Sequence, residues 1–129
     1  KPPALNWEDP FMLDEQLTED ERLIRDSARA YADEKLAPRI LEANRHEIFD
    51  RDILSEMGEL GLLGSTIPEQ YGGIGMGFVS TMLVTDYISS ATGSLATAFG
   101  AHTGIGTMPI TLYGTEEQKQ KQLKDHISE

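Results

Sequence analysis

The residues from Tyr87 to Thr115 include no aspartate, glutamate, lysine or arginine, although 26% of the chain is charged. Such a run is hard to place on a solvated surface, so we expect it to be mostly buried. It contains several glycines, a proline, a histidine and many hydroxyl side chains, whereas a membrane span needs about 20 predominantly apolar residues. We therefore expect its central part, from Ser94 to about Tyr113, to be a buried helix of a globular protein.

Length and charge limit the fold and the partners. With 129 residues and 39% hydrophobic content, the chain has the size of one domain with a single core. Its net charge of −11 disfavours nucleic acid and anionic membrane surfaces as partners. The absence of cysteine excludes disulfides, thiolate metal sites and a cysteine nucleophile. The first residues fit neither a secretory signal nor a transit peptide, so we expect a cytoplasmic protein, or one of the mitochondrial matrix after processing.

The chain divides into a short lead and a helical part. Residues 1–17 look like an extended lead, anchored by Trp7, Phe11 and Leu13. Residues 18–129 carry apolar side chains at helical spacing, and no stretch alternates with a period of two for long enough to form a strand. The expected fold is therefore all-α, a helical bundle of about five to six helices that forms one domain.

Several helix boundaries follow from local signals. Thr18 with Glu21, and Thr115 with Gln118, have the spacing of capping boxes at helix starts. Pro38 lacks an amide hydrogen, so the helix should kink or restart there. Apolar side chains are expected to form the stripes Ile24, Ala28 and Tyr31 in the first helix and Ile53, Leu54, Met57 and Leu60 in a helix with its N-cap at Asp50. That helix should end at Gly61, and a loop should follow over 62–77. The next expected helix covers 78–91 with Val79, Met82, Leu83 and Tyr87 inward, and the last carries a thin stripe of Leu123 and Ile127.

The glycine-rich loop, Ile67-Pro68-Glu69-Gln70-Tyr71-Gly72-Gly73, permits two interpretations. Glycines allow backbone amides to approach a phosphate, but the glycine spacing after Tyr71 does not fit G-x-G-x-x-G, and no strand precedes it. The favoured interpretation is a chain reversal in which glycines adopt positive φ.

No metal site or catalytic pair is expected. His46, His102 and His126 lie on different predicted elements, and Glu42 with His46 is the common kind of charged pair on a helix surface. His102 stands within the uncharged run, and we expect a buried imidazole bonded to a backbone carbonyl there.

The predicted helix from Ser94 is unusually slender, since small residues lie on every face of it. Gly100 and Gly104 could admit a neighbouring helix as a small-xxx-small contact, or the helix could admit a ligand. The two interpretations are compatible, because different faces could serve each.

Particular segments resemble the amino-terminal helical domain of the acyl-CoA dehydrogenases. The glycine loop and the segment Pro109-Ile110-Thr111-Leu112-Tyr113-Gly114 carry the resemblance, which covers the chain from Leu17 to about Leu123. The first half, including Glu56-Met57-Gly58-Glu59-Leu60-Gly61-Leu62-Leu63-Gly64, is most similar to the glutaryl-CoA dehydrogenase branch. The resemblance implies oxidation of an acyl-CoA between its α and β carbons, with FAD as hydride acceptor, a glutamate as base, and an electron-transfer protein as partner.

The resemblance also implies a substrate-binding role for part of the slender helix. It assigns one wall of the acyl pocket to Ala96, Thr97, Ala98, Ala101 and Gly104, and no catalytic residue to this chain. In the glutaryl branch an arginine pairs with the distal carboxylate of the substrate, and Ala96 stands at that position. Without that cation a buried carboxylate would be unpaired, which argues against a glutaryl substrate.

What the chain lacks leads to two further expectations. The flavin-binding β domain and the carboxy-terminal helical domain of the family are absent from the sequence, so the chain alone should hold no FAD, should not turn over and should self-associate. The alternative is a stand-alone helical scaffold or interaction module, natural or engineered, because the end from Leu123 lacks the usual Leu-Pro and should let the last helix run on.

Overall fold

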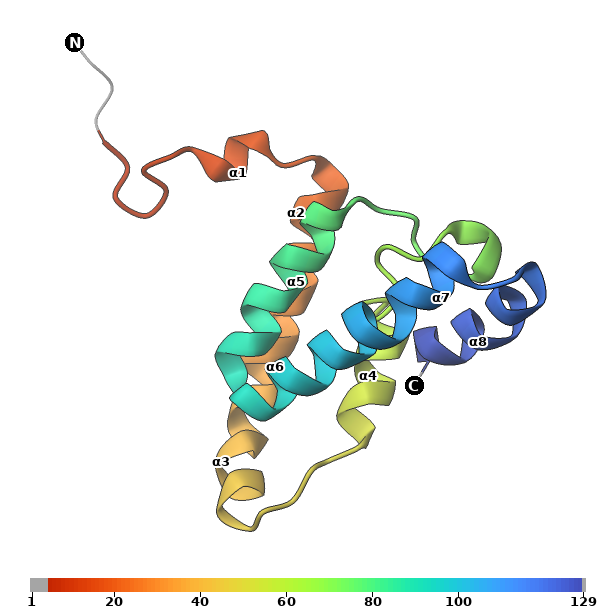
Figure 1. Ribbon diagram of the computed structural model, residues 1–129. Coiled ribbons are helices and arrows are strands. Elements are labelled where there is room, and N and C mark those ends of the chain that lie inside the picture. Colours follow the sequence, from red (N-terminus) through yellow and green to blue (C-terminus); the bar gives the residue numbers. More distant parts are fainter. Residues whose placement is uncertain (1–4, 129) are drawn as a thin grey trace.

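The computed structural model describes residues 5–128, and all of their regular structure is helical (Figure 1). The elements in chain order are α1 (Leu13–Gln16), α2 (Glu19–Tyr31), η1 (Ala32–Leu36), α3 (Ala37–Arg45), α4 (Asp52–Glu59), η2 (Glu69–Tyr71), α5 (Phe78–Ala91), α6 (Gly93–Gly100), η3 (Ala101–Thr107), α7 (Met108–Tyr113) and α8 (Glu116–Ser128). The segments η1 and η3 are π-helical, and η2 is a 3₁₀ turn.

Six helical runs result over the described residues, because α2–η1–α3 and α6–η3–α7 are each continuous and α1, α4, α5 and α8 stand alone. The prediction of an all-α bundle of about five to six helices is confirmed. None of the described helices has the length and apolar character needed to cross a bilayer.

Each π-helical segment ends two residues before a proline. Pro38 is the second residue of α3 and Pro109 the second residue of α7, so each lacks the amide that an α-helix would use there. The amide of Ala37 reaches back five residues to the carbonyl of Ala32, as a π turn requires. The expected restart at Pro38 is not found, because the chain stays helical by widening the preceding turn into a π-helix.

The two capping boxes are confirmed, and the N-cap position of α4 is Arg51, one residue after the predicted Asp50. Thr18 and Glu21 exchange backbone and side-chain bonds of 3.2 and 2.9 Å, and Thr115 and Gln118 do the same at 3.3 and 2.8 Å. Helix α4 begins two residues after Asp50, whose carboxylate accepts the Asp52 amide at 3.1 Å and so satisfies one amide at the start of the helix.

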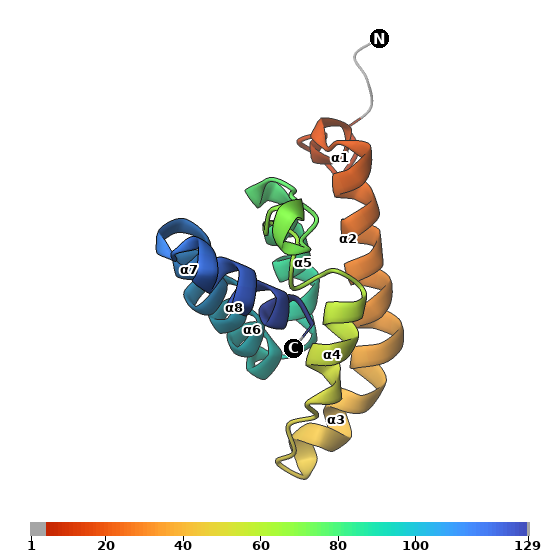
Figure 2. The same cartoon turned by 90° about the vertical axis from the view of Figure 1, so that its right-hand side faces the viewer.

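The core forms where α5 packs between α2 and the α6–η3–α7 run (Figures 1 and 2). Its main cluster includes the predicted stripe of α2 and the predicted residues Ile53 and Met57 of α4, with Leu36, Val84, Ile88, Leu95 and Phe99. A smaller cluster joins Leu123 of α8 to Ile67 and Tyr71 of the glycine-rich loop.

The predicted inward face of α5 is wrong for Val79 and Met82, whereas Leu83 and Tyr87 are half-buried and Tyr87 packs against the main cluster. Val79 and Met82 are about half exposed, and the buried positions are Ser80, Val84 and Ile88, four residues apart. Apolar side chains occur all round α5, so periodicity could not select the face that meets α2.

The predicted anchors of the lead are also wrong. Trp7, Phe11 and Leu13 are 84%, 77% and 58% exposed. The lead is not wholly extended either, because the Asp9 carboxylate accepts the amides of Leu13 and Asp14 at 2.8 and 2.9 Å and so starts the single turn of α1. Residues 1–4 of the predicted lead lie outside the described residues.

The uncharged run from 87 to 115 is not mostly buried, in contrast to the expectation. Among its residues only Ile88, Leu95, Phe99 and Thr107 are buried. The helical run α6–η3–α7 lies at the edge of the bundle, so only one of its sides meets α5 and the core (Figure 2).

Candidate functional site

The run α6–η3–α7 has an exposed side that carries no charge. Leu95, Phe99 and Thr107 anchor the opposite side in the protein. The exposed side bears Thr97, Gly100, Ala101, Gly104 and Ile105, which we call the open stripe. Their spacing of three and four residues places them along one face of the helix.

Three of the five predicted substrate-binding residues lie on the open stripe. Thr97, Ala101 and Gly104 are exposed there, whereas Ala96 and Ala98 are half-buried beside it. Whether any of them contacts substrate stays a prediction. The predicted site residues do not include Gly100 and Ile105. Steps of three and four residues along the helix from Thr97 lead to Gly100 and, through Ala101, to Ile105, so helical spacing could have identified both.

Within this chain, the proposed helix–helix contact through glycines is wrong. A Cβ added at Gly100 or at Gly104 would find no atom within 4 Å, so neither glycine is needed for packing against another described element. Glycine in a helix costs about 0.5–1 kcal/mol relative to alanine. The open stripe therefore carries a cost in stability that no contact among residues 5–128 explains.

The stripe is small and weakly polar. The Thr97 hydroxyl donates to the Gly93 carbonyl at 3.0 Å, so its hydrogen is already used within the helix. The Thr103 hydroxyl likewise donates to the Phe99 carbonyl at 2.8 Å. A surface of this kind can approach an aliphatic chain closely and cannot pair with a charge.

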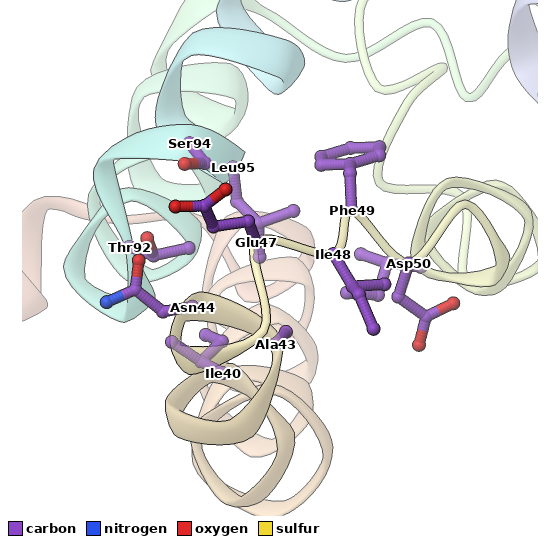
Figure 3. A pocket seen from close by; sticks show the side chains of 11 residues that line it. Ile40, Ala43, Asn44, Glu47, Ile48, Phe49, Asp50, Thr92, Ser94 and Leu95 are labelled. Atoms are coloured by element: carbon purple, nitrogen blue, oxygen red, sulfur yellow. The ribbon is translucent and has the colours of Figure 1, made fainter.

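The main hollows of the described surface lie away from the open stripe. One, of about 250 Å³, lies between the end of α3, the following loop and the start of α6 (Figure 3). The side chains of Asn44 and Glu47 reach towards Thr92 and Ser94 across it. Its volume is below the roughly 300–1,000 Å³ usual for small-molecule sites. Since no residue of the open stripe lines any of these hollows, the stripe is a single wall and encloses no pocket by itself.

The loop glycines act in the predicted chain reversal. Gly72 and Gly75 have φ values of 94° and 71°, which confirms the expectation of positive φ. Gly73 has a different role, because a Cβ there would lie 2.0 Å from the Ile67 carbonyl oxygen. The loop is closed by the Gly75 amide, which donates to that carbonyl at 2.9 Å.

The histidines form no metal site in the described part of the chain. His46 pairs with Glu42 at 3.4 Å on the exposed surface of α3, as predicted. His102 is half-buried, and its Nε2 lies 2.5 Å from the His126 carbonyl oxygen, which confirms the predicted backbone partner. The ring of His126 stacks on that of His102, a contact between distant segments of which the sequence gives no sign.

Comparison with known proteins identifies the family of this chain. The family model of the acyl-CoA dehydrogenase N-terminal domain matches residues 18–129. The chain belongs to this family. The match begins at Thr18, the N-cap of α2, and it includes the whole helical part that carries the open stripe.

Individual acyl-CoA dehydrogenases are similar over most of the chain. The mitochondrial isovaleryl-CoA dehydrogenase of Pongo abelii is 37% identical over 87% of this chain and 27% of its own length. An acyl-CoA dehydrogenase of Bacillus anthracis, solved in complex with FAD, has a TM-score of 0.81 at 40% identity, covering 88% of this chain and 20% of its own. The glutaryl-CoA dehydrogenase of Mycobacterium smegmatis has a TM-score of 0.80 at 27% identity, and the match covers 90% of this chain and 30% of its own.

The chain spans 19–27% of the length of the first curated relatives that it matches. These similarities confirm the predicted membership of the acyl-CoA dehydrogenases. They favour the dehydrogenase-domain interpretation over the stand-alone scaffold.

Proposed function

We propose that residues 18–129 serve as the amino-terminal domain of an FAD-dependent acyl-CoA dehydrogenase, in which the open stripe forms one wall of the acyl pocket. The observation that supports this most is the exposed, uncharged face of Thr97, Ala101 and Gly104 on a helix anchored by Phe99. An aliphatic chain is held by close apolar contact, and small side chains permit the closest approach.

The chain contributes positioning to the reaction and no reacting group. Dehydrogenation removes a proton from the α carbon and a hydride from the β carbon, and FAD, when bound, supplies the hydride acceptor. The open stripe would hold the acyl chain in place and exclude water from it.

The residues of the stripe do not fit the flavin itself. Its helical run has no lysine or arginine that could pair with a pyrophosphate. The amides of the glycine-rich loop already donate to carbonyls of the same loop, so they are not available to a phosphate. We therefore propose that FAD is held by other parts of a full-length protein, which would also carry the base and meet the electron-transfer protein.

The substrate that we propose has a neutral acyl chain. Ala96 and Ala98 flank the stripe and carry no charge that could pair with a distal carboxylate. In a full-length protein that contains this chain, we expect butyryl-CoA to be turned over faster than glutaryl-CoA. Ala96→Arg should shift that preference towards glutaryl-CoA by about tenfold or more, because an unpaired buried guanidinium disfavours a neutral chain.

The measurement is kcat/KM for the two thioesters with an artificial electron acceptor. Ala30→Arg adds the same charge at an exposed position of α2 and should leave the preference unchanged. The isolated 129-residue chain is the negative control and should give no reduction of the acceptor. A parent that prefers glutaryl-CoA, or an unmoved preference in Ala96→Arg, would contradict the proposed substrate, and turnover by the isolated chain would contradict the proposed division of roles.

We also propose that the isolated chain self-associates through its uncovered apolar side chains. Ile105, Leu112 and Tyr113 are 78%, 60% and 86% exposed on the α6–η3–α7 run. Such a surface normally meets another domain or protein. Sedimentation velocity should show a weight-average mass that rises with concentration, with binding of a hydrophobic dye; a monomer at every concentration without dye binding would argue against association.

The proposed compartment is the cytoplasm or the mitochondrial matrix.

A further inference from the structure

The last turn of α8 fits tightly between other elements. A Cβ added at Gly58 of α4 would lie 2.7 Å from the Ile127 carbonyl oxygen. One added at Gly106 of η3 would lie 3.2 Å from Cε1 of His126. Both distances are shorter than ordinary van der Waals contact; glycine is required at Gly58, which meets backbone, and it permits the close approach of the His126 ring at Gly106.

Two histidines join that turn to η3. The rings of His102 and His126 stack with centroids 4.9 Å apart and an interplanar angle of 29°. His102 Nε2 must donate to the His126 carbonyl, because a carbonyl oxygen only accepts. The Thr107 hydroxyl donates its single hydrogen to the His102 carbonyl at 2.8 Å, so His126 Nδ1, 3.1 Å away, is the donor to Thr107 Oγ1.

These bonds determine both tautomers of the neutral pair. His102 carries its hydrogen on Nε2 and His126 on Nδ1, so each ring keeps one free nitrogen lone pair. A proton can therefore add to either ring without breaking a hydrogen bond. What opposes the second proton is the repulsion of two stacked imidazolium rings in a half-buried place.

We propose that His102 and His126 form a proton-sensitive latch, which holds the last turn of α8 on η3 while the pair carries at most one charge and releases it when both rings are protonated. The proposal rests on contacts within the chain and is independent of the proposed function. Because η3 also carries Ala101 and Gly104 of the open stripe, release of α8 would remove a support from behind that surface.

The groups around the pair do not cancel the repulsion. A hollow of about 480 Å³ reaches both rings and provides access for protons; it is lined also by Arg51, Asp52 and Asp125. Burial lowers the pKa of His126, the charge of His102 lowers it further, and the Asp125 carboxylate offsets part of this. Arg51 and Asp52 at the start of α4 bring one charge of each sign to the same hollow.

The lowered pKa of His126 sets the direction of the effect. The released turn has a histidine of ordinary pKa, about 6.5, and therefore binds more protons than the docked turn in mildly acidic solution. Docking is fully stable above that pKa and weakens as the pH falls through it towards the lowered value. The slope for one linked proton cannot exceed about tenfold per pH unit.

Amide hydrogen exchange of the full 129-residue chain, followed by NMR between about pH 5 and pH 7, tests the latch. After correction for the intrinsic exchange rate, we expect the protection of the Leu123 and Ile127 amides to decrease as the pH is lowered. The protection of the Ala28 amide in α2 should stay constant. In His126→Gln the dependence should vanish, since an amide can donate to Thr107 and does not titrate. His46→Gln, at an exposed histidine, should retain it.

A second variant tests the repulsion directly. His102→Gln keeps a donor for the His126 carbonyl and removes the neighbouring charge, so the NMR titration midpoint of the His126 ring should move to higher pH. The latch is ruled out if that midpoint does not move, or if the α8 amides lose protection equally in the parent and in His126→Gln.

Discussion

Replacing Phe99 by alanine is expected to lower the free energy of unfolding by about 3–5 kcal/mol, as large truncations in a packed core do. Phe99 is fully buried and belongs to the main cluster with Leu95, Val84 and Ile88. It is also the main anchor of the run that carries the open stripe. Urea denaturation followed by far-ultraviolet circular dichroism measures the loss.

Ile105→Ala is the matched control for this substitution, because Ile105 lies on the open side of the same helical run and is 78% exposed. We expect a change within about 0.5 kcal/mol. If Phe99→Ala were as mild as Ile105→Ala, the assignment of buried and open sides to this run would be incorrect.

Gly73→Ala is expected to destabilise the protein by about 3 kcal/mol, because the added carbon meets backbone that has little freedom to move. The new Cβ would lie 2.0 Å from the Ile67 carbonyl oxygen and 2.5 Å from its carbon. The same carbonyl accepts the Gly75 amide, so relief of the clash would break a bond that closes the loop. Tyr71 and Ile67, which form the smaller cluster with Leu123, would shift with it.

Gly104→Ala provides the contrasting control, since nothing lies within 4 Å of its Cβ position. Alanine there should stabilise the isolated chain by about 0.5–1 kcal/mol. Equal losses for the two substitutions, measured in the same urea experiment, would contradict the difference between a glycine required by packing and one left open.

Local signals predicted the elements well. Both threonine capping boxes, the helix from Phe78 to Ala91 and the helix end at Gly61 agree with the structure, where Gly61 has a φ of 74°. These features depend on residues within four positions of one another, so the sequence contains the whole interaction.

Signals that depend on a partner element were less successful. Periodicity selected Val79 and Met82 for the core, whereas α2 packs on the side of Val84 and Ile88. The absence of charge from 87 to 115 predicts burial within the chain, which the structure does not show. It marks a helix with one covered side and one open side, and composition does not distinguish the two.

The sequence by itself determined the helical class, most helix ends, the family resemblance and the slender character of the run that bears Ala96 to Gly104. Only the tertiary structure decided which of those residues are exposed, that Gly73 is needed for a close backbone approach, and that His102 meets His126 from another element. The physical reason is that capping and helix propensity act between near neighbours, whereas burial and ring stacking require segments distant in sequence to pack together.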